Sequence, residues 1–167
     1  METELATERL TMRRARPEDL DAIHAVVSDF DVARHTANWP HPADRAYTSK
    51  RAEPVDPAIG MAGPVLLGGE IIGLMGLIAG DLGYMFARAY WGRGYATEIG
   101  RALIAHAWAS YDWPRIEAGV FEGNPASERV LKKLGFAPVG DDQHWCAAEG
   151  RDRPLRVFHL PRPCTGF

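Results

Sequence analysis

A glycine-rich turn near the middle of the 167-residue chain has the composition of an anion-binding loop: Trp91-Gly92-Arg93-Gly94-Tyr95-Ala96. Glycines at a strand-to-helix turn let the backbone come close to a ligand. The unpaired N–H groups of a helix that begins at about Gly94 attract anions, and Arg93 adds a fixed positive charge suited to phosphate. We therefore expect a phosphate or pyrophosphate to bind here.

Other phosphate-binding motifs do not fit this loop. A nucleoside triphosphatase loop needs the triplet Gly-Lys-Ser/Thr, which the chain lacks. A dinucleotide-binding fingerprint needs a third glycine where this sequence has Thr97, and it lies near the first strand of a parallel unit rather than mid-chain. A glycine-rich turn that merely begins a helix is the remaining alternative, and the loop alone does not decide between the two.

A second motif lies about thirty residues further on: Asn124-Pro125-Ala126-Ser127-Glu128-Arg129-Val130-Leu131-Lys132-Lys133-Leu134-Gly135-Phe136. With the glycine loop before it, this run resembles the GNAT superfamily of N-acetyltransferases. The closest likeness is the branch that acetylates ribosomal-protein N-termini, which the opening Glu8-Arg9-Leu10-Thr11-Met12-Arg13 and the pair Tyr90-Trp91 also resemble. The resemblance covers nearly the whole chain, with both motifs in the family's order.

The resemblance implies acetyl-CoA as cofactor and assigns its contacts. The pantetheine arm is expected beside the strand that ends in Met85, Phe86 and Ala87, with Asn124 also contacting it and Lys133 nearer the nucleotide. The pyrophosphate is expected on the loop and helix start, at Gly92, Arg93, Gly94, Tyr95, Ala96 and Thr97. One cofactor position departs from the family pattern, because Trp91 stands where many members have Gln or Arg.

The implied reaction is direct attack of a neutral amine on the thioester, with both substrates bound at once. A backbone N–H of Phe86 or Ala87 would polarise the carbonyl oxygen. Many relatives have a tyrosine acid at the position of Leu131, so we expect Ser127 to replace it; helix capping and packing is the equally weighted alternative. Tyr84 is a weaker candidate acid, and we also expect it among the acceptor-site residues.

The group that accepts the amine proton has several candidates. Asp81 lies in the turn before the cofactor strand, where a plain turn residue is the more usual interpretation. Glu117 alternates with apolar residues and faces either the acceptor or solvent. His144 has a suitable ordinary pKa, and a proton relay through solvent needs no single base. For the acceptor itself, we expect contacts from Trp39 and His41, in the connection between the first two helices.

Composition is ordinary for a soluble globular protein, with 46% hydrophobic and 25% charged residues. A formal net charge of -3 gives no basic field for nucleic acid or anionic lipid. Two cysteines in no metal-ligand spacing, an acidic N-terminus and no long apolar run predict a cytoplasmic protein without a metal site or membrane span. The acceptor stays open between protein N-termini and small-molecule amines, and a homodimer, common among relatives, is one alternative for the oligomeric state.

The elements that must position these residues follow from periodicity and turn residues. They predict one α/β domain over residues 1–167, with a mixed, mostly antiparallel sheet of six to seven strands and about four flanking helices. The resemblance to the GNAT superfamily implies that this sheet is splayed at the cofactor site. We expect strands at 10–13, 64–67, 70–78, 82–86, 116–121, 144–148 and 155–160. We expect helices from 17 to about 30 and at 44–52, 94–110 and 125–134. The rivals to an acetyltransferase are a non-catalytic acyl-CoA-binding sensor and a nucleotide-dependent enzyme.

Overall fold

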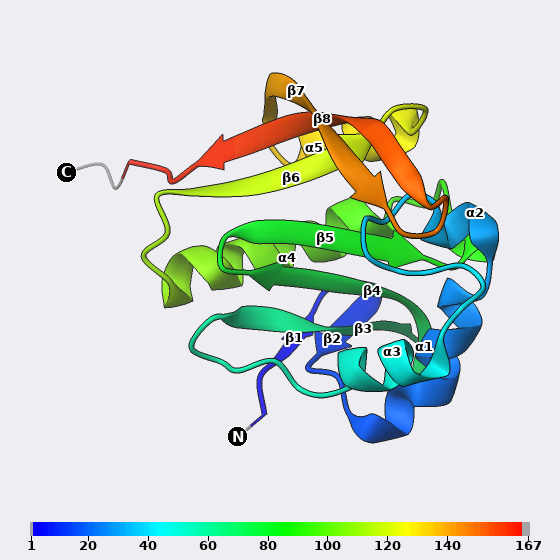
Figure 1. Ribbon diagram of the computed structural model, residues 1–167. Coiled ribbons are helices and arrows are strands. Elements are labelled where there is room, and N and C mark those ends of the chain that lie inside the picture. The colour runs from blue at the N-terminus through cyan, green and yellow to red at the C-terminus, as the bar shows by residue number, and fades with distance from the viewer. Residues whose placement is uncertain (1, 165–167) are drawn as a thin grey trace.

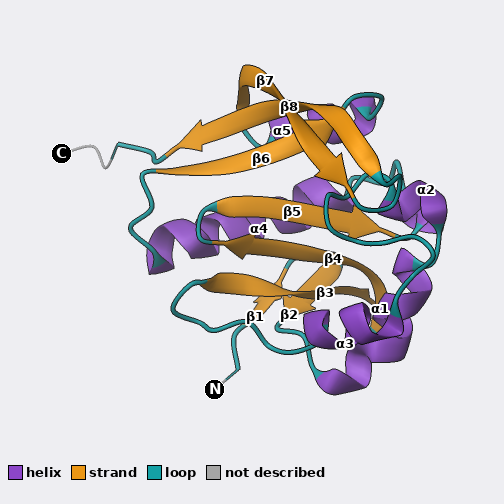
Figure 2. Cartoon of the chain, in the orientation of Figure 1, coloured by secondary structure: helices purple, strands orange, loops and turns teal. Residues whose placement is uncertain are grey.

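The computed structural model describes residues 2–164 and shows one curved sheet with helices on both faces (Figures 1 and 2). The strands are β1 (Glu4–Ala6), β2 (Leu10–Arg13), β3 (Gly60–Leu67), β4 (Glu70–Ile78), β5 (Asp81–Phe86), β6 (Arg115–Phe121), β7 (Ala137–Cys146) and β8 (Arg151–Pro161). The helices are α1 (Leu20–Val27), α2 (Phe30–Ala33), α3 (Arg45–Arg51), α4 (Tyr95–Ser110) and α5 (Pro125–Lys133), with single 3-10 turns η1 (Pro17–Asp19) and η2 (Arg88–Tyr90).

The sheet has the order β1-β2-β3-β4-β5-β6-β8-β7, and every neighbouring pair is antiparallel except β5 with β6. That parallel pair is joined at a single register position, Asp81 opposite Glu117. The Glu117 N–H donates to the carbonyl of Gly80 at 2.8 Å. Beyond this point the two strands diverge, so the sheet is splayed between β5 and β6.

Apolar side chains pack against both faces of the sheet. The larger cluster includes Leu82 and Phe86 of β5 together with Ile99 and Leu103 of α4, which crosses behind the strands in Figure 1. The smaller cluster joins Met85, from the opposite face of β5, to three valines of α1 and α2: Val26, Val27 and Val32. Strand β5 is therefore held from both sides up to its last residues.

The predicted fold class is confirmed, with an extra short strand, β1, at the sheet edge. The helix predicted from residue 17 to about 30 is divided, because the Asp29 side chain caps a new helix by accepting the N–H of Asp31 at 3.0 Å. Strand β7 is longer than the predicted 144–148. Nine of its ten residues are exposed, so it lacks the alternation that marks a half-buried strand, and its ladder with β8 defines it instead.

A largely buried ion pair between Arg13 and Asp19 fixes the turn from β2 into α1. Both terminal nitrogens of Arg13 donate to the Asp19 carboxylate, at 2.8 and 2.9 Å, and the Arg16 N–H donates to it at 2.8 Å. Burial alone would raise the pKa of Asp19, but these hydrogen bonds outweigh burial and lower its pKa below the ordinary value. The charged carboxylate is therefore the form that the fold stabilises.

Asp19→Ala should lower the free energy of unfolding by about 3 kcal/mol, since it leaves the Arg13 guanidinium without its partner. Urea denaturation measures this, with Glu2→Ala as control because the Glu2–Arg16 pair is exposed and should contribute nothing measurable. The Asp19 contribution should be complete above its ordinary pKa and lost as pH falls through the lowered pKa. Equal stability of Asp19→Ala and wild type would contradict this role.

Candidate functional site

A cleft of about 1180 Å³ opens where β5 and β6 diverge. It is lined by the ends of both strands, the start of α4, the first turns of α5 and the segment between α2 and α3. Of the residues predicted to form the site, all line this cleft except Ala87 and His41. His41 instead packs its ring against Phe30, with ring centres 4.9 Å apart.

The glycine-rich loop forms one end of the cleft. Gly92 and Gly94 have φ values of +71° and +78°, in the left-handed region that favours glycine, and Gly94 is the residue at which α4 begins. A side chain built on Gly92 would meet no atom within 4 Å, and one on Gly94 only the Arg9 guanidinium at 3.6 Å. Their backbone surface is thus open to a ligand, beside the first-turn N–H groups of α4.

The Arg9 side chain contacts and stabilises this loop, a role that was not predicted from the sequence. Its guanidinium donates to the carbonyl of Arg93 at 3.1 Å and to the Glu98 carboxylate at 2.8 Å. It also lies over the ring of Tyr95, 4.6 Å from the ring centre. The turn between β1 and β2 therefore supports the loop from outside the cleft, although the Arg9 side chain is 43% exposed.

The edge of β5 offers main-chain groups to the cleft. The Ala87 N–H donates to the Ile72 carbonyl on β4 at 2.9 Å. Because hydrogen-bonded and non-hydrogen-bonded pairs alternate along an antiparallel ladder, the N–H groups of Tyr84 and Phe86 point away from β4, toward β6. The Trp91 indole N–H donates to the Phe86 carbonyl at 2.7 Å, which ties the loop to the end of β5.

Two hydroxyl groups meet across the cleft. Tyr84 Oη lies 2.6 Å from Ser127 Oγ and 3.4 Å from the Ser127 carbonyl oxygen. Asn124 performs the helix capping, since its side-chain oxygen accepts the Ser127 N–H at 3.2 Å, so the serine hydroxyl is not used as a cap. Burial raises the pKa of Tyr84 to about 12, which keeps its phenol protonated near neutral pH.

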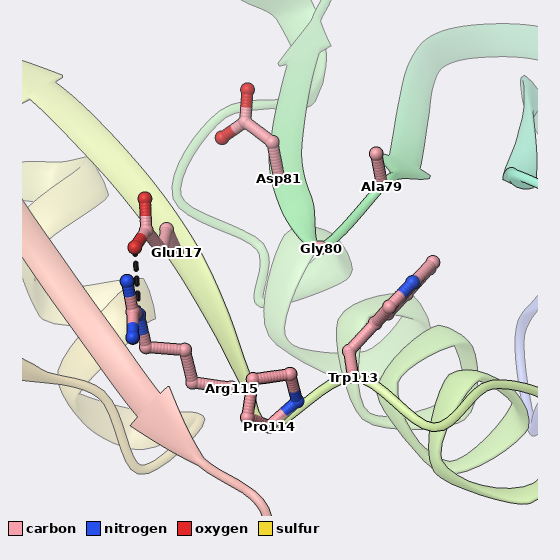
Figure 3. Close-up of a pocket in the computed structure, with 7 residues that line it drawn as sticks. All are labelled: Ala79, Gly80, Asp81, Trp113, Pro114, Arg115 and Glu117. Carbon is pink, nitrogen blue, oxygen red and sulfur yellow. Dashed lines mark hydrogen bonds and ion pairs between the residues drawn. The ribbon is translucent and has the colours of Figure 1, made fainter.

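Two carboxyl groups face each other at the narrow end of the splay, beside a recess of about 260 Å³ (Figure 3). Burial in this recess, followed by the charge of Glu117, raises the pKa of Asp81. Arg115 donates to Glu117 at 2.7 Å and lowers the pKa of that carboxyl, and His159 lies 3.2 Å from it. Protonation is therefore favoured at Asp81 and disfavoured at Glu117.

Aromatic side chains line the far wall of the cleft, opposite α5. Trp39 packs edge-on against Tyr47 of α3 at 5.2 Å, and the Arg51 guanidinium lies 5.8 Å from its ring centre. His144 also lines the cleft, whereas Trp145 beside it is 55% exposed and does not. Tyr47 and Arg51 were not predicted from the sequence as neighbours of Trp39, because no local motif comparable to the glycine-rich loop marks these two residues.

Residues 9–137 match the family described as Acetyltransferase (GNAT) domain. The chain belongs to the GNAT acetyltransferase family. An uncharacterized N-acetyltransferase of Bacillus licheniformis, p20, is 30% identical over 174 residues, which cover 96% of each chain. This confirms the family that the two motifs predicted.

Solved structures of GNAT enzymes share the fold. RimL, a ribosomal L7/L12 alpha-N-protein acetyltransferase in complex with coenzyme A, superposes with a TM-score of 0.83 at 17% identity, over 95% of this chain and 98% of that one. The ribosomal-protein-S5-alanine acetyltransferase from Vibrio fischeri gives a TM-score of 0.78 at 17% identity, over 99% and 100%. At these identities the likeness concerns the fold.

Across residues 2–164, no helix combines the length and the apolar character needed to cross a membrane. In the same range, no group of three or more His, Cys, Asp and Glu side chains is arranged to hold a metal ion.

Proposed function

We propose that this GNAT protein is an N-acetyltransferase that transfers the acetyl group of acetyl-CoA to a primary amine by direct attack, with both substrates bound. The observation that supports this most is the cleft itself. One wall of it joins the free edge of β5 to the glycine loop, and the other presents Ser127 at the start of α5. When bound, acetyl-CoA supplies the reactive thioester.

The residues present fit such a donor. We assign the pantetheine arm to the β5 edge at Met85 and Phe86, with Asn124 opposite. The free N–H on this edge is that of Phe86, because the Ala87 N–H is bonded to β4 and the Met85 N–H points to the same side. We assign the pyrophosphate to the main chain between Gly92 and Thr97, with Arg93 and Lys133 as the nearby cations. Trp91 replaces the usual polar side chain by holding the Phe86 carbonyl through its indole N–H.

Polarisation of the thioester carbonyl falls to the Phe86 N–H. The sequence left this role between Phe86 and Ala87, and the Ala87 N–H is engaged by Ile72. The Phe86 N–H faces the cleft by the alternation of the β4–β5 ladder. A fixed backbone donor of this kind stabilises negative charge that develops on oxygen without having to reorganise.

Ser127 acts as the acid in this mechanism, supported by Tyr84. The Tyr84 hydroxyl has both oxygens of Ser127 within reach as acceptors. When Tyr84 donates to Ser127 Oγ, the serine proton is free to go to the departing sulfur. The high pKa of Tyr84 keeps its phenolic proton in place for this donation.

Asp81 is the base that the electrostatics favour. Glu117 is held by Arg115 and His159, which makes it a poor proton acceptor. Asp81 has its pKa raised toward the working range of a general base, and it lines both the recess and the cleft. Its position five residues before Phe86 on β5 places it away from the thioester, so the proton travels through water.

The function is tested by following thiol release from acetyl-CoA with a panel of peptides, amino acids and polyamines. Turnover that depends on one class of amine supports the proposal and identifies the acceptor. Tight acetyl-CoA binding by calorimetry without turnover on any amine would favour a non-catalytic sensor. Thermal stabilisation by ATP or NAD, but not by acetyl-CoA, would overturn both.

Replacing Gly94 by valine should abolish acetyl-CoA binding while the protein stays folded. The φ of +78° makes valine strained there, and its side chain would cover the backbone assigned to the pyrophosphate. Gly68→Val is the matched control, since Gly68 also has positive φ and open surroundings but lies in the β3–β4 turn. Calorimetric titration should show binding by the control alone; unchanged binding by Gly94→Val would reject the pyrophosphate site.

Ser127→Ala should lower kcat about 100-fold, with the dissociation constant of acetyl-CoA changed little. Tyr84→Phe should lower kcat by a smaller factor, because the serine keeps its own proton. Ser127→Thr retains a hydroxyl and should recover much of the rate. A loss confined to acetyl-CoA affinity in Ser127→Ala would assign the serine to cofactor binding instead.

Asp81→Asn should lower kcat by about 100-fold and remove the acidic limb of the rate-against-pH profile that Asp81 produces. Glu117→Gln should move that limb to lower pH. The charge of Glu117 raises the pKa of Asp81, so its removal lets Asp81 lose its proton, and become active as a base, at lower pH. Steady-state rates from pH 5 to 9 measure both; wild-type rates in Asp81→Asn would point to solvent as the base.

A further inference from the structure

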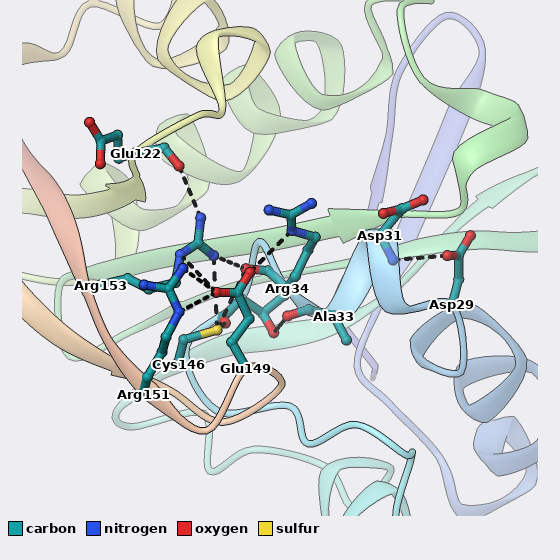
Figure 4. A network of polar contacts seen from close by, with 10 residues as sticks. Asp29, Asp31, Ala33, Arg34, Glu122, Cys146, Glu149, Arg151 and Arg153 are labelled. Atoms are coloured by element: carbon teal, nitrogen blue, oxygen red, sulfur yellow. Dashed lines mark hydrogen bonds and ion pairs between the residues drawn. The ribbon is translucent and has the colours of Figure 1, made fainter.

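A buried arginine connects the two sides of the cleft. Arg153, on β8, is only 4% exposed. One terminal nitrogen donates to the carbonyl of Arg34 at 2.6 Å and the other to the carbonyl of Glu122 at 2.9 Å (Figure 4). Its Nε lies 3.5 Å from Glu149, and its guanidinium is stacked 4.7 Å from the ring centre of Phe121.

The two carbonyl groups belong to segments that border the cleft on opposite sides. Arg34 caps the end of α2, and residues 35–39 after it line the cleft. We call residues 35–39 the acceptor wall. Glu122 follows β6 and lies two residues before Asn124. Asn124 caps the start of α5 by accepting the Ser127 N–H. One guanidinium therefore spans from the acceptor wall to the helix that presents the proposed acid.

Further contacts attach the same wall to the β7–β8 hairpin. The Ala147 N–H donates to the Ala37 carbonyl at 2.9 Å. The buried Cys146 thiol lies 3.6 and 3.7 Å from the carbonyls of Arg34 and Thr36. Residues 35–39 belong to no helix or strand, so these contacts, with Arg153 at their centre, set where the wall stands.

The positive charge of Arg153 is balanced by the carboxylate of Glu149. Glu149 has a side chain only 11% exposed and lies within ion-pair distance of Arg34, Arg151 and Arg153. A buried guanidinium with a carboxylate, two carbonyls and an aromatic face has its donors satisfied in a fixed geometry. Removing this guanidinium would leave the two buried carbonyl oxygens without a hydrogen-bond donor, and residues 34–39 would no longer be held in one position.

We propose that Arg153 is a positioning residue for the acceptor amine: it holds residues 34–39 against the β7–β8 hairpin and keeps Trp39 in register with Ser127. The proposal rests on the acetyltransferase function proposed above. It assigns the Arg153–Glu149 pair to the acceptor half of the cleft. The β5 edge and the glycine loop, which form most of the acetyl-CoA half, make no contact with this pair; Asn124, on the same half, lies two residues after the Glu122 carbonyl that Arg153 binds.

The test compares Arg153→Met and Arg153→Lys with Arg151→Ala. Arg151 contacts the same Glu149 carboxylate, but its side chain is 63% exposed and does not reach either carbonyl in the structure. We expect Arg153→Met to raise the KM for the acceptor found in the amine panel at least tenfold, since a wall that is no longer fixed holds the amine in fewer productive orientations. Its acetyl-CoA dissociation constant should change by a much smaller factor than the KM for the acceptor. Arg153→Lys should recover part of the loss and Arg151→Ala should behave as wild type.

Hydrogen exchange of residues 35–39 provides a second readout that does not need turnover. These amides should exchange faster in Arg153→Met than in wild type or Arg151→Ala, with amides of α4 unchanged. Lower thermal stability with wild-type KM and wild-type exchange in residues 35–39 would overturn the proposal and make Arg153 a stabilising residue only. If Arg153→Met does not fold, Arg153→Lys takes its place: its KM for the acceptor and its exchange in residues 35–39 should both exceed those of wild type and of Arg151→Ala, and wild-type values of both would overturn the proposal. If wild type turns over no amine, the acetyltransferase function fails, and exchange alone decides whether Arg153 holds the wall.

Discussion

The single point of contact between β5 and β6 is the constraint on which the rest of the site depends. A strand buried in a sheet normally has its N–H and C=O groups paired on both edges, because unpaired groups away from water are costly. Here pairing stops after Asp81 and Glu117, and the remaining edge of β5 faces an open cleft. Packing on both faces holds β5 in place there, through Phe86 toward α4 and through Met85 toward α1 and α2. The free edge is therefore a rigid main-chain surface suited to an extended ligand.

Much of the local structure of the proposed acetyl-CoA half could be predicted from the sequence because its signals are local. Positive φ requires glycine at Gly92 and Gly94, and a capping asparagine followed by proline marks the start of α5. Both motifs are read from a few consecutive residues. Their order along the chain indicated the family, while the periodicity of the segments around them indicated the fold class.

The features that the sequence did not reveal all depend on contacts between distant residues. Tyr84 and Ser127 are 43 positions apart, and Arg9 and Arg93 are 84 apart. Arg153 and Arg34 are separated by 119. No periodicity relates such pairs, and each residue alone has an ordinary role as a core aromatic or a surface charge. His41 illustrates the reverse error: it is close in sequence to Trp39, but its ring turns away from the cleft to pack on Phe30.

The same division explains why the donor is easier to infer than the acceptor. The donor half is made mostly of main-chain groups, which any sequence with glycines at the right places and a strand edge left open can supply. The proposed acceptor half is made of side chains on a segment without regular structure, such as Trp39. This segment contacts α3 through the packing of Trp39 on Tyr47, and it contacts Arg153 through the carbonyl of Arg34. Substitutions there change the shape and charge of the wall without disturbing the sheet. A fold of this kind can therefore keep one donor while its acceptor changes, and a residue such as Arg153, which binds the wall at Arg34 and the segment before α5 at Glu122, limits how far the wall can move.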